Sequence, residues 1–222
     1  MPRQPFPGTV TALELQAKVR KHLGQRVNVF INDRFSFAID IELARRHDLH
    51  PGLVIDELML TELLREDGDA RTYARALHFM SYRMRSAAEV RTRLERDQWP
   101  SEVIDRVLER LAREKLLDDA GFAAAWVETR SMSRPRGGRA LRQELRHKGI
   151  DREAIDAALP DAEQELENAV AAVQPKVQRW ANLDERERRT KVLEFLQRRG
   201  FNYSTARAAL QRLEEEQDGE ED

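Results

Sequence analysis

Apolar residues between positions 138 and 159 follow the spacing of two short helices joined by a tight turn. Leu141 and Leu145 stand four residues apart, so they share one face of the first helix. Gly149 comes directly after them, where the end of a helix favours a left-handed residue without a side chain. Asp151 can then cap a second helix that buries Ile155. The pattern predicts a helix-turn-helix unit.

The same unit occurs three times along the chain at a constant spacing of 51 residues. The equivalent apolar positions are Val90, Leu141 and Val192; Leu94, Leu145 and Leu196; Trp99, Ile150 and Phe201; and Leu108, Leu159 and Leu210. The turn glycine recurs as Gly200, whereas Gln98 takes its place in the first copy. One further helical segment precedes each copy, over residues 72–82, 120–131 and 162–179. A period of this size is typical of stacked structural repeats, so we expect a mainly α-helical protein with three tandem three-helix repeats, elongated and curved.

The first part of the chain has a different pattern, with two runs that alternate apolar and polar residues. These runs cover residues 27–31 and 35–39, with a turn at 32–34 between them, and a weaker run covers 10–16. A short helical stretch at 41–46 and leucine-rich residues between 53 and 64 can cover such strands. The pattern predicts a small α/β module with a β-hairpin or a three-stranded antiparallel sheet.

We therefore predict five segments, with a linker near residues 66–69. The α/β module takes residues 1–68, the three repeats take 69–118, 119–161 and 162–213, and a disordered acidic tail takes 214–222. Pro175 is expected to interrupt or kink the long helix that opens the third repeat. Ser86 and Asp118–Asp119 are expected to cap helices.

The charge is divided unevenly, although the net charge of the whole chain is only −2. Residues 1–69 carry a net −2, residues 70–213 a net +7, and the last nine residues a net −7. The basic residues are 32 Arg and 6 Lys, and arginine suits bidentate contact with phosphate or carboxylate groups. A basic array indicates a polyanionic or strongly charged partner. The acidic tail is either a solvated end or a segment that competes for the basic face.

The residue patterns that mark catalytic, metal-binding or nucleotide-hydrolysing proteins are absent from the sequence. There is no cysteine, no pair of glycines spaced G-x-G and no phosphate-binding loop motif. His47 and His50 form a close pair without an evident carboxylate partner, and Asp118–Asp119 is better explained by helix capping. The N-terminus lacks the features of a signal peptide, and no apolar run is long enough to span a membrane. We expect a cytoplasmic monomer that is not an enzyme and binds no metal or cofactor.

Basic side chains gather in each copy of the helix-turn-helix unit and form the predicted binding surface. The candidates are Arg83, Arg85, Arg91, Arg134, Arg136, Arg139, Arg142, Arg146, Lys148, Arg198 and Arg199. Arg139, Arg142 and Arg146 are spaced i, i+3 and i+7, which places them on one side of a helix, away from Leu141 and Leu145. The second copy has the largest excess of positive charge, so it is the first choice for a binding surface.

Three stretches of the chain resemble the RecX family of bacterial regulatory proteins of RecA. They are Leu-Leu-Asp-Asp at 116–119 with Phe122; Arg-Pro-Arg-Gly-Gly-Arg at 134–139 with the helix and turn that follow to Ile150; and Arg-Arg-Gly-Phe at 198–201. The resemblance covers about residues 70–213, and the segment before residue 70 is similar to an N-terminal extension of some members. The family's usual turn glycine is replaced by Gln98, and the acidic tail is a second departure.

The resemblance implies a non-enzymatic modulator that binds the RecA–single-stranded DNA filament and suppresses its ATPase, strand-exchange and co-protease activities. The resemblance also implies a role in recombination, DNA repair and the SOS response, with the RecA filament and single- or double-stranded DNA as partners. Two alternatives stay open on the residues alone. One is a sequence-specific helix-turn-helix DNA-binding regulator, and the other is a non-catalytic α-solenoid scaffold that binds another protein.

Overall fold

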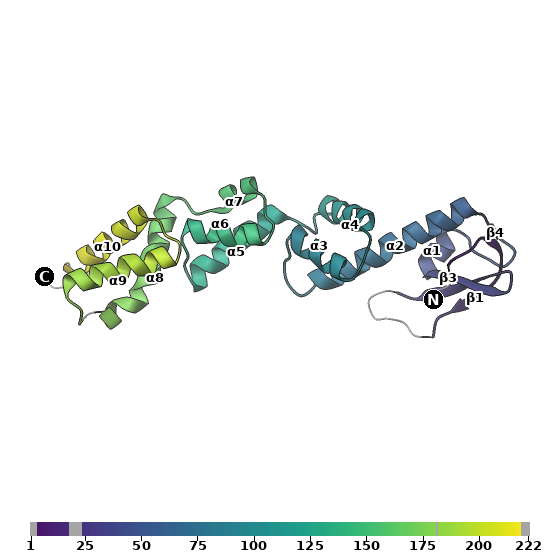
Figure 1. Ribbon diagram of the computed structural model, residues 1–222, viewed down its shortest axis with the longest axis horizontal. Helices are drawn as coiled ribbons and strands as arrows, with labels where there is room; N and C mark the ends of the chain where they lie inside the picture. The colour runs from purple at the N-terminus through teal and green to yellow at the C-terminus, as the bar shows by residue number, and fades with distance from the viewer. Residues whose placement is uncertain (1–3, 18–23, 181, 219–222) are drawn as a thin grey trace. The chain divides into compact units, whose positions relative to one another are not determined.

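The computed structural model describes residues 4–17, 24–180 and 182–218, which contain ten helices and four strands (Figure 1). The described residues form two compact units. The first unit contains residues up to 85 together with 90–117, and the second contains 86–89 together with the residues from 118 onward. The predicted fold class is confirmed, since a mixed α/β module is followed by three-helix repeats.

Four antiparallel strands in the order β3-β2-β1-β4 form the sheet of the N-terminal module. The strands are β1 (Gly8–Leu15), β2 (Arg26–Ile31), β3 (Arg34–Asp40) and β4 (Val54–Ile55). The turn between β2 and β3 holds Asn32 and Asp33 at φ 49° and 63°, the two positive values that a tight hairpin turn requires. Strand β4 goes beyond the sequence prediction, because its two residues are too few to show an alternating pattern.

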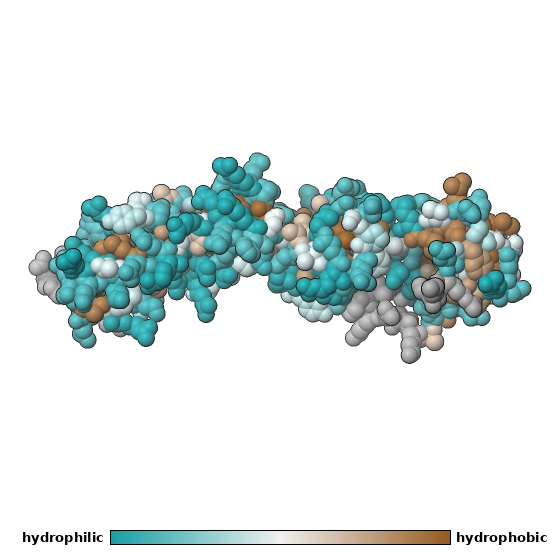
Figure 2. All heavy atoms as spheres, in the orientation of Figure 1, coloured by the Kyte–Doolittle hydropathy of each residue, from teal (hydrophilic) through white to brown (hydrophobic). Residues whose placement is uncertain are grey.

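One face of the sheet is covered by α1 (Ile41–Arg46) and by the first half of α2 (Glu57–Met80). Alternate residues of β2 point into this core, so Val29 and Ile31 are fully buried. Asp40 caps α1, because its carboxylate accepts the backbone N–H of Glu42 at 2.9 Å. Figure 2 shows apolar surface over this module, where Leu58 is 83% exposed.

The linker that the sequence predicted near residues 66–69 is wrong, because α2 runs through it as one continuous helix. Asp67, in the middle of the predicted linker, is only 5% exposed. Its two carboxylate oxygens each lie 2.9 Å from a guanidinium nitrogen of Arg26, and one of them also accepts the backbone N–H of Asp40. An acidic residue thus belongs to the core of the module because its charge is paired and its lone pairs are occupied.

The first repeat consists of the second half of α2, α3 (Ala87–Arg96) and α4 (Ser101–Arg113). Its buried residues include Leu94, Ile104 and Leu111, which are fully shielded from solvent. Ser86 accepts the backbone N–H of Glu89 at 3.2 Å, as expected for the residue that caps α3.

The second repeat consists of α5 (Asp119–Ser133), α6 (Gly138–His147) and α7 (Arg152–Ala158). Asp118 and Asp151 cap α5 and α7, since each accepts a backbone N–H three residues ahead at 2.8 Å. Leu141, Leu145 and Ile155 are buried together in the core of this repeat, so the helix-turn-helix prediction is confirmed.

The third repeat consists of α8 (Ala162–Trp180), α9 (Glu185–Arg198) and α10 (Tyr203–Asp218). Pro175 lies inside α8, which continues past it and is not interrupted. Helix α10 also continues past Leu213 into the segment predicted as a disordered tail, because Glu and Gln are good helix formers. Glu214 in that segment lies 2.9 Å from the guanidinium of Arg189. Residues 219–222 of the predicted tail lie outside the described residues.

The three turns share one backbone geometry. Gln98, Gly149 and Gly200 have φ 64°, 75° and 88°, all in the left-handed region. In each turn the next backbone N–H donates to a carbonyl five residues earlier, at 3.1–3.2 Å, as in a Schellman cap. Gln98 therefore occupies the position that glycine fills in the other two repeats.

Candidate binding surface

The predicted basic residues of the first unit make contacts within that unit. Arg91 lies 2.5 Å from a carboxylate oxygen of Asp105. The guanidinium of Arg85 lies over the ring of Phe79, 4.0 Å from its centroid, and Arg83 donates to the carbonyl of Met84. Arg91 and Arg85 are thus already engaged by an ion pair and a cation–π contact.

Four of the predicted residues in the second unit are paired with a carboxylate. Arg136 pairs with Glu144 at 2.7 Å, and Arg142, Lys148 and Arg198 pair with other carboxylates. Arg142 lies 3.3 Å from Asp156, Lys148 lies 2.6 Å from Glu89, and Arg198 lies 3.5 Å from Glu194. Each of these carboxylates offsets the charge of its partner, so these three side chains contribute less to a binding surface than their number suggests.

The remaining candidates keep their charge available. Within the described parts of the chain, no carboxylate lies within ion-pair distance of Arg134, Arg139, Arg146 or Arg199. Arg134, Arg139 and Arg146 are exposed, and Arg199 is half-buried. The structure therefore narrows the predicted surface of the second unit to these four side chains and to Arg136, whose partner Glu144 is shared with Arg130.

Two glycine-containing segments lock the second repeat onto the third. The backbone N–H of Gly137 donates to the carbonyl of Arg199 at 3.1 Å, and that of Arg139 donates to Gly200 at 3.3 Å. A Cβ atom on Gly137 would lie 2.2 Å from the backbone nitrogen of Phe201, so only glycine permits this approach. The loop that carries Arg134 and Arg136 is thereby held against the turn that carries Arg199.

The contact between the second and third repeats, which we call the joint, brings together a cluster of like charges. The cluster consists of Arg134, Arg136 and Arg199. The guanidinium of Arg199 lies over the ring of Phe195, 4.8 Å from its centroid, and donates to the carbonyl of Pro135 at 3.3 Å. The guanidinium of Arg199 thus lies beside Pro135, the residue between Arg134 and Arg136. Burial, and then the charges of Arg136 and Arg134, lower the pKa of Arg199. An anion at this joint would relieve the repulsion between the three side chains.

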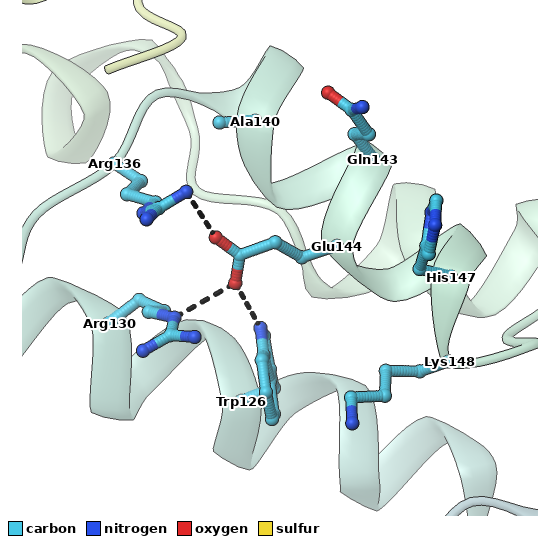
Figure 3. A pocket seen from close by; sticks show the side chains of 8 residues that line it. All are labelled: Trp126, Arg130, Arg136, Ala140, Gln143, Glu144, His147 and Lys148. Carbon is cyan, nitrogen blue, oxygen red and sulfur yellow. Dashed lines mark hydrogen bonds and ion pairs between the residues drawn. The ribbon is translucent and has the colours of Figure 1, made fainter. Parts of the chain in front are cut away.

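A cleft of about 410 Å³ opens beside this cluster, between α5 and α6 (Figure 3). It is lined by Trp126, Arg130, Arg136, Ala140, Gln143, Glu144, His147 and Lys148. Figure 3 shows that Arg130, Arg136 and Trp126 converge on the carboxylate of Glu144. The distances are 2.8 Å from Arg130 Nε, 2.7 Å from Arg136 Nη1 and 2.8 Å from Trp126 Nε1.

Two cations flank the indole of Trp126 in this cleft. The guanidinium of Arg130 lies 4.6 Å from the ring centroid, and Nζ of Lys148 lies 5.1 Å from it. The ring of Phe122 stacks on the same indole at 5.8 Å. Trp126 is thus a fixed aromatic wall with positive charge beside it.

The sequence prediction included Arg136 and Lys148 but missed the other residues that line the cleft. The sequence gives little indication of these residues, because core residues recur every 51 positions and these polar residues do not. The positions equivalent to Glu144 are Arg93 in the first repeat and Phe195 in the third. The carboxylate at the centre of the cleft therefore belongs to the second repeat alone.

No group of three or more His, Cys, Asp or Glu side chains in the described part of the chain could hold a metal ion. His47 contacts Glu66 at 3.2 Å, and His50 contacts the carbonyl of Pro51 at 2.9 Å. None of the helices in these ranges is both long and apolar enough to cross a membrane.

Four domain models of one protein family match the chain in succession. They are the RecX N-terminal domain over residues 8–56, and the first, second and third three-helix domains of RecX over 73–111, 118–159 and 163–210. The residues that line the cleft, between 126 and 148, thus fall within the second three-helix domain.

Relatives named regulatory protein RecX align with most of the chain. The regulatory protein RecX of Bacillus subtilis is 34% identical over 196 residues, which is 87% of this chain and 74% of the relative. That of Bacillus pumilus is 32% identical over 206 residues, or 91% of this chain and 77% of the relative.

Two solved structures have a similar fold. A crystal structure of regulatory protein RecX superimposes with a TM-score of 0.71 at 29% identity, over 90% of this chain and 97% of that chain. RecX from Lactobacillus salivarius gives a TM-score of 0.64 at 24% identity, over 67% of this chain and 98% of that one, and supports the fold alone.

Proposed function

Because the chain belongs to the RecX family of regulatory proteins, we propose that it is a negative regulator of RecA. It binds the RecA–single-stranded DNA filament and inhibits ATP hydrolysis, strand exchange and co-protease activity. In this role it acts in the cytoplasm, as a monomer, in recombination, DNA repair and the SOS response.

The arginine cluster where the second and third repeats meet is the observation that supports this proposal best. Arg134 and Arg199 have no carboxylate partner within the residues that the structure describes, and backbone hydrogen bonds fix the two segments that carry them. A nucleoprotein filament offers phosphates and acidic side chains to such a surface. Guanidinium groups bind such anions bidentately, and the backbone segments that carry these two are held together.

In this role the protein binds the filament stoichiometrically and catalyses no reaction. A regulator of this kind changes the activity of RecA by occupying its filament, so inhibition should scale with the fraction of filament that is covered. A basic surface suits this role, because electrostatic attraction speeds association with a polyanion.

The alternative of a sequence-specific DNA reader is less well supported. In a helix-turn-helix protein of that class, the second helix of the unit presents side chains to base edges in the major groove. In the second repeat that helix is α7, whose exposed residues include Glu153 and Asp156. Glu153, which has no ion-pair partner within the residues described, would be repelled by the phosphates that flank the groove. The charge of Asp156, by contrast, is offset by Arg142 and Arg152.

Co-sedimentation and electron microscopy of the full chain with RecA on single-stranded DNA test the proposed partner. We expect the protein to sediment with the filament and to add continuous density along it. The matched control is RecA without DNA, which forms no such filament under the same conditions. A protein that remains in the supernatant while the filament sediments would contradict the proposal.

A further inference from the structure

We propose that the cleft between α5 and α6 receives one nucleotide of a single-stranded nucleic acid. The base lies against the wall formed by Trp126 and Arg130, and its phosphate lies at Arg136 and Arg199. This inference rests on the proposed function, because it names the part of the nucleoprotein filament that the second repeat contacts. It goes beyond the basic surface, because the lining of the cleft also includes the aromatic Trp126 and the polar Gln143.

The size of the cleft fits a heterocyclic ligand better than a simple anion. Its volume of about 410 Å³ lies in the range of small-molecule sites, whereas a lone carboxylate or phosphate would leave most of it empty. The indole of Trp126 and the methyl group of Ala140 supply apolar lining, and cations stand around it. A flat apolar body with a negative group attached matches that combination.

The wall of the cleft presents a surface on which a base can stack. The guanidinium carbon of Arg130 lies over the indole of Trp126, 4.6 Å from the ring centroid, so an arginine plane and an aromatic ring stand together in the wall. Bases in single strands stack on aromatic rings and on arginine planes. Gln143 and His147 are exposed on α6 and also line the cleft, so both offer hydrogen-bonding groups to a ligand bound there.

The positive charge beside the wall exceeds what the carboxylate in the cleft can offset. Glu144 is shared between Arg130, Arg136 and the indole N–H, so one negative charge serves two guanidinium groups. Arg199 and Arg134 add two further charges at the adjoining joint. A phosphate bound between Arg136 and Arg199 would neutralise this excess through charge-assisted hydrogen bonds.

Fluorescence of Trp126 gives a direct test in the absence of RecA. The double substitution Trp99→Phe and Trp180→Phe leaves Trp126 as the single tryptophan of the full chain. We expect saturable quenching by an oligothymidylate of about ten residues, a length within the usual site sizes of single-strand-binding proteins. Thymidine monophosphate should quench only at higher concentration, because it makes one phosphate contact and not several.

Two variants tie the signal to the cleft. Arg136→Ala should weaken oligonucleotide binding by roughly tenfold and lower the slope of log K against log salt by about 0.7, the share of one phosphate on a single strand. Gln143→Glu changes an exposed side chain, so it should leave the helical circular dichroism intact while weakening binding through charge repulsion. The matched control is Arg152→Ala, because Arg152 belongs to the same repeat and its side chain, which is 89% exposed, is paired with Asp156. This variant should change neither the affinity for the oligonucleotide nor the slope of log K against log salt.

Several results would overturn the inference. Unquenched Trp126 emission in the presence of the oligonucleotide, or equal binding by Gln143→Glu and the parent, would show that no nucleotide enters the cleft. If polyglutamate quenched Trp126 as strongly as the oligothymidylate does, the ligand of the cleft would be an acidic peptide and not a nucleic acid. If thymidine monophosphate bound as tightly as the oligothymidylate, the ligand would be a free nucleotide and not a strand. Because RecA is absent, inhibition of RecA can stand or fall independently of these outcomes.

Discussion

Gln98 has the same left-handed backbone conformation as Gly149, the residue at the equivalent position one repeat later, with φ 64° against 75°. A side chain in this region clashes with its own backbone at a cost of about 1–2 kcal/mol, which glycine avoids. We therefore expect Gln98→Gly to raise the free energy of unfolding by about 0.5–1 kcal/mol, since part of the gain is lost to the greater freedom of glycine in the unfolded chain. Urea denaturation checks this value, and a destabilised variant would contradict it.

The same position in the second repeat gives the matched opposite case. Gly149→Ala introduces the left-handed strain, and it also places a Cβ atom 2.3 Å from Cβ of Ala88. We expect this substitution to lower the free energy of unfolding by more than the strain alone, about 2 kcal/mol or more. Equal stability of Gly149→Ala and the parent would show that the turn can shift to relieve both effects.

Leu145 tests whether the apolar stripe of α6 holds the second repeat together. The side chain is fully buried among Phe122, Leu141 and Ile155. Leu145→Ala should lower the free energy of unfolding by about 2–5 kcal/mol, through lost burial and the cavity that remains. Met132→Ala in α5 is the control, because Met132 is 82% exposed and its removal should change stability by less than about 0.5 kcal/mol.

The polar side of α6 should matter for binding and not for folding. Replacing Arg139, Arg142 and Arg146 together by Ala should weaken inhibition of RecA while the helical circular dichroism stays unchanged. Arg142 is paired with Asp156, whereas the other two have no carboxylate partner within the residues described. The double variant Arg139→Ala, Arg146→Ala should therefore account for most of the loss, and Arg142→Ala alone for little. Full inhibition by the triple variant would exclude this surface.

Asp119 makes the stability of the second unit depend on pH. Burial is the main reason why the pKa of its carboxyl is raised from the ordinary value of 3.8; the backbone N–H of Ala87 opposes the shift, and Asp151 and Asp118 add to it. A raised pKa in the folded state means that the stabilising contribution of this group is present below the ordinary value and is lost as the pH rises through the folded value.

Replacing the charge tests this linkage. Asp119→Asn keeps an oxygen that can accept the N–H of Ala87 but carries no charge. The variant should gain stability relative to the parent as the pH rises from the ordinary value of 3.8 through the raised pKa of the folded state, so the difference in unfolding free energy between the two proteins should grow with pH and then level off. The comparison with the parent at each pH cancels the titration of the other carboxylates. A difference that shrinks as the pH rises would contradict the assignment.

The sequence revealed the parts of the fold that depend on local rules. The spacing of Leu141, Leu145 and Ile155 identifies a helix-turn-helix unit because helical geometry alone decides which residues share a face. Asp151 and Gly149 mark helix ends for equally local reasons, namely hydrogen bonding at a cap and tolerance of a positive φ.

The features that the sequence did not reveal depend on contacts between distant residues. The sequence places Asp67 in a linker, since its partner Arg26 is 41 positions away and nothing in the sequence indicates the pairing. The sequence does not single out Glu144 either, because its three donors come from α5 and from the loop before α6. The sequence showed an excess of arginine, but only the structure separates the paired side chains, such as Arg142, from the unpaired ones.

ATP hydrolysis by RecA on single-stranded DNA is the measurement that tests the central claim most directly. Purified full-length protein is added in increasing amounts to a preformed filament, and the rate of hydrolysis is followed in the steady state. The account predicts a rate that falls as the protein covers the filament and a weaker fall with the Arg139→Ala, Arg146→Ala variant. Hydrolysis that stays unchanged at stoichiometric protein would contradict it.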